Sequence, residues 1–537
     1  MKPDTPDPSL RKAVVGILLL LVLQALLAWD FTSFAALLEW QPESWLFPAL
    51  AGLSVVLAGR VSGLLLWPLA AWCGLLLLVR LGEFSLMTFF GREIDLKWDI
   101  WMLPNLRDLV VHTVGEAAAW GLLVAGVLLF LLLVALLGIL LKGTTLVLNR
   151  PGRLAAWILL PVLILALDRG KAAPSQSHRL LTAMAEAWYF HAYQDAVDQI
   201  LMEARGKQLG LPADLGRLDG ADVLIFFVES YGRIAWDAPA YRERLLPQAE
   251  ALGNAFREAG YHVGSRFVRS PVMGGGSWLA HASFLTGVKT QHQILWERLL
   301  QSPIRPLPGF FRDKGYETVS VMPAMKIEEW PEGAYFEFSR DLWFHDFGYD
   351  HHGYHWSPMA DQFALVRFDE LVLRPTEQPV FAEFVLTSSH APFAVVPPFH
   401  EGEWSREGVM RTLRSRPMQL FENDYHHLEE GPEGYATALL YSLRSITDFI
   451  TRHYKRDGLV IIIGDHQPMA FMPGTDTRDV PLHVMTRDAT IMARLRQNGF
   501  SAAWSPDPGT PSLPMEGVME LFLRSVSDPN NKDRQSL

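Results

Sequence analysis

Hydrophobic positions follow two different patterns on either side of residue 170. Upstream, long apolar runs are broken only by short polar stretches, and they cover residues 13–35, 45–59, 61–81, 113–141 and 153–168. A helix that crosses a membrane needs about 20 mostly apolar residues. The pattern therefore predicts an α-helical membrane anchor of about five spans. Basic residues near the ends of the runs favour a cytoplasmic N-terminus and an external C-terminal part.

Downstream, short apolar β-branched runs alternate with stretches of helical periodicity. The runs predict strands at Val223–Val228, Thr318–Met322, Phe381–Leu386, 459–463 and Leu482–Met485, with helices at 239–260 and 434–454. This alternation is typical of an α/β/α domain with a mostly parallel sheet. We therefore divide the chain into an anchor (1–170), a juxtamembrane connecting helix (171–215), an α/β domain (216–526) and a flexible tail (527–537).

Charge and cysteine content exclude two classes of function. Basic and acidic side chains balance over the first 170 residues, so the net charge of −11 belongs to the downstream part. An acidic domain of this kind argues against nucleic acid as a partner. Cys73 is the single cysteine and lies in an apolar run. The chain can therefore form no internal disulfide, and its α/β domain has no cysteine nucleophile.

An Asp-His pair follows the strongest predicted strand. The run 459–463 ends at Gly464, which places Asp465 and His466 at the carboxyl end of a buried strand. Ligands and metals gather at this end of open α/β sheets. One carboxylate and one imidazole suit a divalent cation. A structural Asp-His hydrogen bond is the alternative interpretation.

Two further motifs follow predicted strands. Glu229 ends the first strand and offers a second carboxylate, although a helix cap formed with Ser230 is the alternative. Three glycines precede Ser277, where a helix is expected to begin. A helix N-terminus gathers free N–H groups and suits a nucleophile that carries a phosphate. A structural glycine loop capped by serine is the alternative here.

Histidines occur in two other places. His390 follows a strand within Thr387–Phe393, where it could hold an anionic oxygen or act as a general acid, or simply be a loop histidine. A cluster of four histidines lies among tyrosines and tryptophans, at positions 345, 351, 352 and 355. We interpret this cluster as an exposed loop and assign it no metal.

Taken together, these motifs resemble the sulfatase-like branch of the alkaline phosphatase superfamily. The chain is most similar to membrane-anchored enzymes of the lipoteichoic acid synthase and phosphoglycerol transferase type. Gly275–Ala280 followed by Gly287 resembles their nucleophile loop, and His390 lies in a similar His-x-Pro-Phe motif. Phe338–Asp341 resembles their Trp-x-Arg-Asp motif, with Phe338 in place of tryptophan. Serine replaces the threonine nucleophile of the lipoteichoic acid synthases.

The resemblance implies an α/β/α alkaline-phosphatase-like domain that binds one divalent metal, most often manganese, with magnesium or zinc as alternatives. It implies a transferase that moves a phosphoglycerol-type headgroup from a phospholipid such as phosphatidylglycerol to a sugar or polymer through a serine-linked intermediate. The enzyme would lie in the cytoplasmic (inner) membrane of a bacterium, multi-pass, with its catalytic domain outside. Its residues would be the nucleophile Ser277, the metal ligands Glu229, Ser277, Asp465 and His466, and the substrate contacts Arg340, His390 and Phe338.

Other activities are compatible with parts of this pattern. A phosphodiesterase or other sulfatase-type hydrolase would use water as the acceptor at the same site. A formylglycine sulfatase is disfavoured, because Ser277 is followed by Trp-Leu-Ala-His rather than by x-Pro-x-Arg. A phosphoethanolamine transferase usually has a disulfide-rich domain, which a single cysteine does not allow. An inactive sulfatase-like sensor module is the alternative outside enzymes.

Overall fold

The computed structural model divides the chain into two compact units, residues 1–87 with 92–193 and residues 88–91 with 194–537. The structure describes residues 8–28, 42–58, 63–90, 114–148, 150–155, 157–159, 191–327, 330–354, 356–421, 433–469 and 477–528, with a few isolated positions between them. The predicted tail lies outside the described residues from position 529. Most of 83–113 and of 160–190 also lies outside them.

The first unit is helical. Its long helices are α1 (Pro8–Ala28), α2 (Pro42–Ala58), α3 (Gly63–Phe90) and α6 (Glu116–Thr144). Cys73, Leu76 and Leu141 are buried where these helices pack against one another. The outer surface of α6 is apolar as well, with Leu122 and Leu129 largely exposed. An apolar surface of this extent suits a lipid environment rather than water.

Two helices among the described residues are long and apolar enough to cross a membrane, Gly63–Thr88 and Glu116–Thr144. The prediction of about five spans is therefore not reproduced in the described part of the chain. The first predicted span lies in α1, a helix of 21 residues, and the second lies in α2, a helix of 17 residues. The fifth predicted span lies outside the described residues from position 160.

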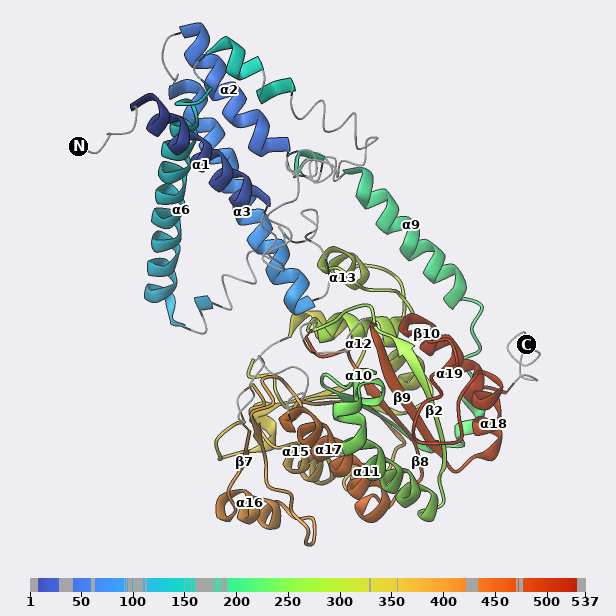
Figure 1. Ribbon diagram of the computed structural model, residues 1–537. Helices are drawn as coiled ribbons and strands as arrows, with labels where there is room; N and C mark the ends of the chain where they lie inside the picture. Colours follow the sequence, from blue (N-terminus) through green and yellow to red (C-terminus); the bar gives the residue numbers. More distant parts are fainter. Residues whose placement is uncertain are drawn as a thin grey trace. The chain divides into compact units, whose positions relative to one another are not determined.

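The second unit is built on an eight-stranded sheet (Figure 1). Its strands follow the order β10-β2-β9-β8-β1-β5-β3-β4, and β9 runs antiparallel to both of its neighbours while the other neighbouring pairs are parallel. The strands are β1 (Asp222–Val228), β2 (His262–Arg269), β3 (Glu317–Met322), β4 (Arg340–Trp343), β5 (Val380–Leu386), β8 (Gly458–Gly464), β9 (Asp479–Thr486) and β10 (Leu513–Pro514). A separate two-stranded antiparallel sheet pairs β6 (Val395–Val396) with β7 (Gln419–Leu420). A strand forms at each predicted place, and the sheet is mostly parallel as predicted.

Helices cover both faces of this sheet, which gives the predicted α/β/α layering. Helices α11, α15, α16 and α17 pack together over one face, and α12, α13, α14, α18 and α19 over the other. The bounds of these helices, and of α9 and α10 before them, are α9 (His191–Gln208), α10 (Ile234–Asp237), α11 (Pro239–Glu258), α12 (Ser277–Thr286), α13 (Gln293–Leu300), α14 (Leu307–Arg312), α15 (Asp361–Phe368), α16 (Arg406–Ser415), α17 (Glu433–Asp448), α18 (Ala489–Gln497) and α19 (Val518–Val526).

The two faces of β1 bury different neighbours. Leu224, Phe226 and Val228 belong to the core beneath α11, α15 and α17. Phe227 instead packs edge-on against Phe284 of α12, with ring centroids 5.4 Å apart. Because side chains alternate along a strand, the residues of odd number on β1 face α12. Because of this alternation, Glu229, which follows the strand, is expected to face α12 as well.

Candidate metal centre

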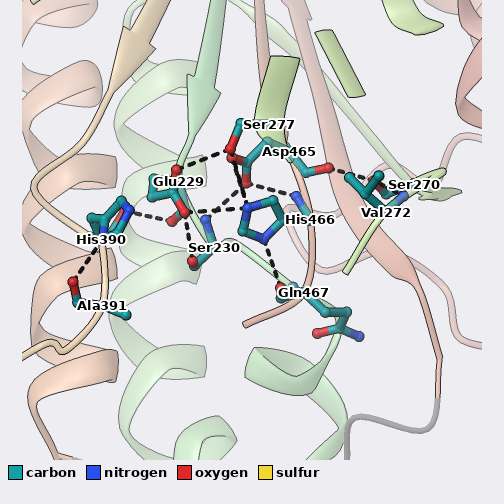
Figure 2. Close-up of polar contacts among 12 residues, drawn as sticks. Glu229, Ser230, Ser270, Val272, Ser277, His390, Ala391, Asp465, His466 and Gln467 are labelled. Atoms are coloured by element: carbon teal, nitrogen blue, oxygen red, sulfur yellow. Dashed lines mark hydrogen bonds and ion pairs between the residues drawn. The ribbon is translucent and has the colours of Figure 1, made fainter. Parts of the chain in front are cut away.

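Two parallel strands carry acids to the same edge of the sheet. Strands β1 and β8 are neighbours, and Val228 pairs with Gly464 in their register. The residues that follow, Glu229 and Asp465, therefore leave the sheet side by side. The backbone N–H of Ser230 donates a hydrogen bond to Oδ1 of Asp465 at 2.9 Å, which fastens the two strand ends together. Figure 2 shows these residues converging on one point.

Gly464 is required by a close approach of the backbone. A β-carbon at this position would lie 1.9 Å from the carbonyl oxygen of Tyr231. No side chain fits in that space without moving the chain that follows β1. The glycine therefore allows the two strand ends to come close enough for Glu229 and Asp465 to share one site.

The glycine-rich loop aims Ser277 at this pair of acids. Gly274, Gly275 and Gly276 all have positive φ angles, of 69°, 151° and 80°, which glycine adopts at low cost. Helix α12 begins at Ser277 directly after them. The Ser277 hydroxyl donates a hydrogen bond to Oε2 of Glu229 at 3.4 Å and lies 3.2 Å from Nε2 of His466. Ser277 is partly exposed.

Glu229, Asp465 and His466 form a buried group of ligand atoms that all lie within 4.8 Å of one another. Nε2 of His466 lies 3.4 Å from Oε1 of Glu229 and 3.5 Å from Oδ2 of Asp465. Nδ1 of His466 lies 2.7 Å from the carbonyl oxygen of Gln467, which only accepts, so Nδ1 carries a hydrogen and Nε2 faces the acids. Three hard or borderline donors at these distances suit one divalent cation.

The two buried carboxylates of this group favour a positive charge beside them. Burial, and then the charge of Glu229, raise the pKa of Asp465 to about 6. Burial acts to raise the pKa of Glu229, but the rings of His466 and His390 outweigh it and hold this pKa below its usual value. Burial acts to lower the pKa of His466, but the two carboxylates outweigh it and raise this pKa. In the chain alone a proton on His466 balances the acids, and a bound cation would replace it.

His390 lies at the rim of the same site. Its ring points toward Glu229 and is half-buried (Figure 2). The loop that carries it is fastened to β1, because the Ser389 hydroxyl donates to the carbonyl oxygen of Glu229 at 2.7 Å. The structure therefore brings His390 beside the predicted metal ligands, as the motif implied.

Asp361 holds the His390 loop from the other side, and sequence reasoning missed it. Its Oδ1 accepts the backbone N–H groups of Thr387 and Ser388, each at 3.1 Å, and its Oδ2 accepts the Ser442 hydroxyl at 2.6 Å. The sequence around Asp361 reads as an ordinary helix start. Its role depends on residues that are close only in the folded chain, so no local signal reveals it.

Arg340 and Phe338 are not brought to the site. Arg340 is the first residue of β4 and pairs with Val319 of β3. Val319 is paired through β5 with Leu224 of β1, so Arg340 and Leu224 lie in the same row across the sheet. Leu224 lies five residues before Glu229, about 16 Å along the strand. The Arg340 guanidinium instead donates to the carbonyl oxygen of Leu371 at 2.8 Å, at the edge where the strands begin.

Phe338 lies just before β4 and stacks on Phe336, with ring centroids 6.5 Å apart. The predicted substrate contacts of the Phe338–Asp341 motif are therefore absent at these two positions. The motif resemblance missed that residues 340–343 form a strand. A strand places its first residue at the opposite edge from the metal ligands.

Comparison with known proteins gives similarity of structure only. No family model and no curated protein matches the chain. The phosphoethanolamine transferase A (EptA) of Neisseria meningitidis is 15% identical, with a TM-score of 0.41 over 89% of this chain and 94% of that chain. The lipoteichoic acid synthase LtaP of Listeria monocytogenes is 15% identical, with a TM-score of 0.37 over 63% and 78%.

The phosphoglycerol transferase GacH of Streptococcus pyogenes, solved with sn-glycerol-1-phosphate, is 13% identical, with a TM-score of 0.35 over 64% of this chain and 96% of that chain. LtaP and GacH are the two kinds of enzyme that the sequence motifs resemble. At such identities a function has to be argued from the side chains of the site.

Proposed function

We propose that the chain is a metal-dependent, membrane-bound phosphotransferase of the sulfatase-like type. It would move a phosphoglycerol-type headgroup from a phospholipid, such as phosphatidylglycerol, to a sugar or polymer acceptor through an intermediate on Ser277. One observation carries the proposal. The Ser277 hydroxyl lies 3.4 Å from Glu229 and 3.2 Å from His466, within a group of three buried donors.

The residues present fit a divalent metal. Two carboxylates and one imidazole converge, and burial and then the charge of Glu229 raise the pKa of Asp465, so a cation bound here would be favoured. Glu229, Asp465 and His466 would hold the ion, with Ser277 as a fourth ligand. When bound, the ion would lower the pKa of the serine hydroxyl and neutralise charge on a phosphate. Manganese, magnesium and zinc all accept this donor set.

The chain's own residues account for the steps of the reaction. Ser277 Oγ attacks phosphorus, its proton leaves toward Oε2 of Glu229, and the bond from phosphorus to the diacylglycerol oxygen breaks. The free N–H groups at the start of α12 face the phosphate that Ser277 then carries. His390, at the rim beside Glu229, would protonate the departing oxygen. In the second step the entering hydroxyl attacks phosphorus and gives its proton to His390, the bond from phosphorus to Ser277 Oγ breaks, and Glu229 returns the proton to that oxygen. Arg340 and Phe338 have no part in this scheme.

The membrane placement belongs to the same proposal. Helices α3 and α6 can span a bilayer by length and composition. The first unit would insert in the cytoplasmic membrane of a bacterium as a multi-pass anchor, and basic residues near the helix ends favour an external catalytic unit. A phospholipid donor would then be available in the same membrane.

A headgroup-release assay on the detergent-solubilised full chain tests the proposal. We expect the wild type, loaded with Mn²⁺, to release diacylglycerol from phosphatidylglycerol, and Ser277→Ala to lose this activity while keeping its fold. The control is Ser415→Ala, which removes an exposed hydroxyl at the end of α16. Release by Ser277→Ala at the wild-type rate would contradict the assignment of the nucleophile.

Two further arms identify the donor and the acceptor. Replacing phosphatidylglycerol by phosphatidylethanolamine distinguishes a phosphoglycerol transferase from a phosphoethanolamine transferase. Adding a sugar or glycan acceptor distinguishes transfer from hydrolysis. We expect the rate to rise with acceptor and the phosphoglycerol group to appear on it; free glycerol phosphate alone would indicate a hydrolase.

A further inference from the structure

One face of helix α12 carries both Ser277 and a buried histidine. Ser277 and His281 are four residues apart, so they project from the same side of the helix, one turn apart. Beneath them lie Phe227, on the odd-numbered face of β1, and Glu229, which directly follows the strand. Ser277 meets Glu229, and the ring of His281 stacks on that of Phe227 at 3.9 Å between centroids, with 18° between their planes.

The polar contact of His281 is a carboxylate from the neighbouring strand. Glu383 lies in the middle of β5 and pairs with Ile225, so it faces α12 as well. Its Oε1 atom lies 2.9 Å from Nδ1 of His281, and these side chains are 1% and 9% exposed. Neither Oε1 of Glu383 nor the other ring nitrogen, Nε2, has a hydrogen-bond partner in the part of the chain that the structure describes, so the contact is one between charged groups rather than a hydrogen bond. Glu383 is therefore the charged group that lies against this ring.

Stability alone does not account for the pair. Burying a carboxylate is costly even when it is partnered, and apolar packing at such a place is often as stable or more so. The next residues in the row across the sheet are polar too, Ser320 on β3 and Asp341 on β4. Asp341 lies close enough to Glu383 that burial and then the charge of Glu383 raise the pKa of Asp341. A role in orienting a neighbouring group would explain why this polar pair is buried here.

The loop before helix α12 is tied to the chain that follows β8, because the backbone N–H of Gly274 donates to the carbonyl oxygen of Gln467 at 3.0 Å. The two glycines between this bond and Ser277 still leave the rotation of the helix about its axis to be fixed by the helix's own contacts. Trp278, the next residue, is exposed. His281, one turn after Ser277, is the next polar side chain of α12 that contacts a buried charged group.

We propose that Glu383 and His281 are positioning residues that fix the rotation of α12 and thereby hold the Ser277 hydroxyl against Glu229 and His466. This inference rests on the proposed role of Ser277 as the nucleophile. Neither residue belongs to the group of ligand atoms at the candidate metal centre. A misplacement of about 1 Å at a reacting group can lower a rate about 100-fold, and loss of a partner that orients a ligand typically costs about 10- to 100-fold.

The test compares Glu383→Leu, which removes the polar contact, with Glu383→Gln, which keeps an oxygen at the same place. With bis(p-nitrophenyl) phosphate as substrate and Mn²⁺ present, we expect Glu383→Leu to lower kcat about 10- to 100-fold. KM and bound Mn²⁺ should stay at wild-type values. Glu383→Gln should recover most of the lost rate. His281→Gln should resemble Glu383→Leu, and the double variant should be no worse than either, because the two residues act as a unit.

Controls separate positioning from a general loss of stability. His453 also stacks on an aromatic ring, that of Trp404 at 4.8 Å, but at the edge of the sheet where the strands begin. We expect His453→Gln to lower Tm at most, with kcat unchanged. If Glu383→Leu does not fold, His281→Gln and Glu383→Gln decide by the same kcat criterion.

Ser277→Ala, measured alongside, separates the two proposals. An inactive Ser277→Ala together with wild-type kcat in the His281 and Glu383 variants overturns the positioning role alone. An active Ser277→Ala overturns the nucleophile, and with it the proposed function. The positioning role is also overturned if kcat falls only in proportion to Tm across the variants and Glu383→Gln does not recover the rate.

Discussion

Oδ1 of Asp465 accepts two backbone hydrogen bonds, from Ser230 at 2.9 Å and from His466 at 2.7 Å. Its other oxygen, Oδ2, faces Nε2 of His466. The two oxygens of one carboxylate therefore have separate tasks. One fastens the ends of β1 and β8 together, and the other remains for an ion.

This division predicts different results for two substitutions of Asp465. Asp465→Asn keeps an oxygen for both backbone donors but places an NH₂ group where Oδ2 was, so we expect a folded chain that no longer binds Mn²⁺. Asp465→Ala removes the acceptor as well, and leaving two buried N–H groups without it costs about 2–4 kcal/mol. Metal analysis and thermal unfolding of the purified variants check this. Wild-type metal content in Asp465→Asn would refute the site.

Metal binding should weaken as the pH falls. The pKa of Asp465 is raised to about 6 and that of His466 is raised above its ordinary value, so the ion must displace a proton from His466 below that raised pKa and from Asp465 as well below about pH 6. We expect the apparent affinity for Mn²⁺ to fall as the pH falls, by about tenfold per pH unit for each proton displaced and most steeply below pH 6. Titration calorimetry in buffers of different ionisation enthalpy measures the protons released. An affinity that is flat from pH 7 to 5 would contradict this.

How much the sequence reveals depends on whether a signal is local. The apolar runs locate β1, β3, β5 and β8, and the glycines next to Ser277 and Asp465 indicate the site. The contact between His281 and Glu383 depends on strand register and helix rotation, which no local pattern encodes. Arg340 is the opposite case. Its motif resembles a substrate contact, but Arg340 begins a strand and therefore lies at the edge of the sheet away from the metal ligands.

We expect the same glycine-to-alanine substitution to have different effects inside the glycine loop, at Gly276, and outside it, at Gly315. Gly276 and Gly315 both have positive φ, of 80° and 82°, and a β-carbon would meet no atom closer than 3.5 Å at either position. An alanine in this conformation costs about 1 kcal/mol at each. We expect Gly276→Ala to lower kcat at least tenfold, because it shifts Ser277, whereas Gly315→Ala should lower Tm alone. Matched Tm values with unequal rates would support this, and equal rates would argue against a role of the loop in aiming Ser277.

His483 predicts how stability depends on pH. Its ring is fully buried between Tyr231, 2.9 Å from Nε2, and Ser265, 2.8 Å from Nδ1. Burial lowers its pKa from 6.5 to about 3. Above pH 6.5 the ring is neutral in the folded and unfolded chain, so its full contribution to stability is present. As the pH falls from 6.5 toward 3, only the unfolded chain takes up the proton, and stability falls by up to about 1.4 kcal/mol per pH unit.

The variant His483→Gln tests this directly. An amide can bond to both hydroxyl groups but does not titrate, so we expect a shallower fall in the free energy of unfolding between pH 6 and 4 than in the wild type. Denaturant unfolding of the two chains, with a chelator present to exclude metal, gives the difference in slope. Because the remaining acids are shared, they cancel in this comparison. Parallel curves would mean that His483 takes up its proton in the folded chain as readily as in the unfolded one.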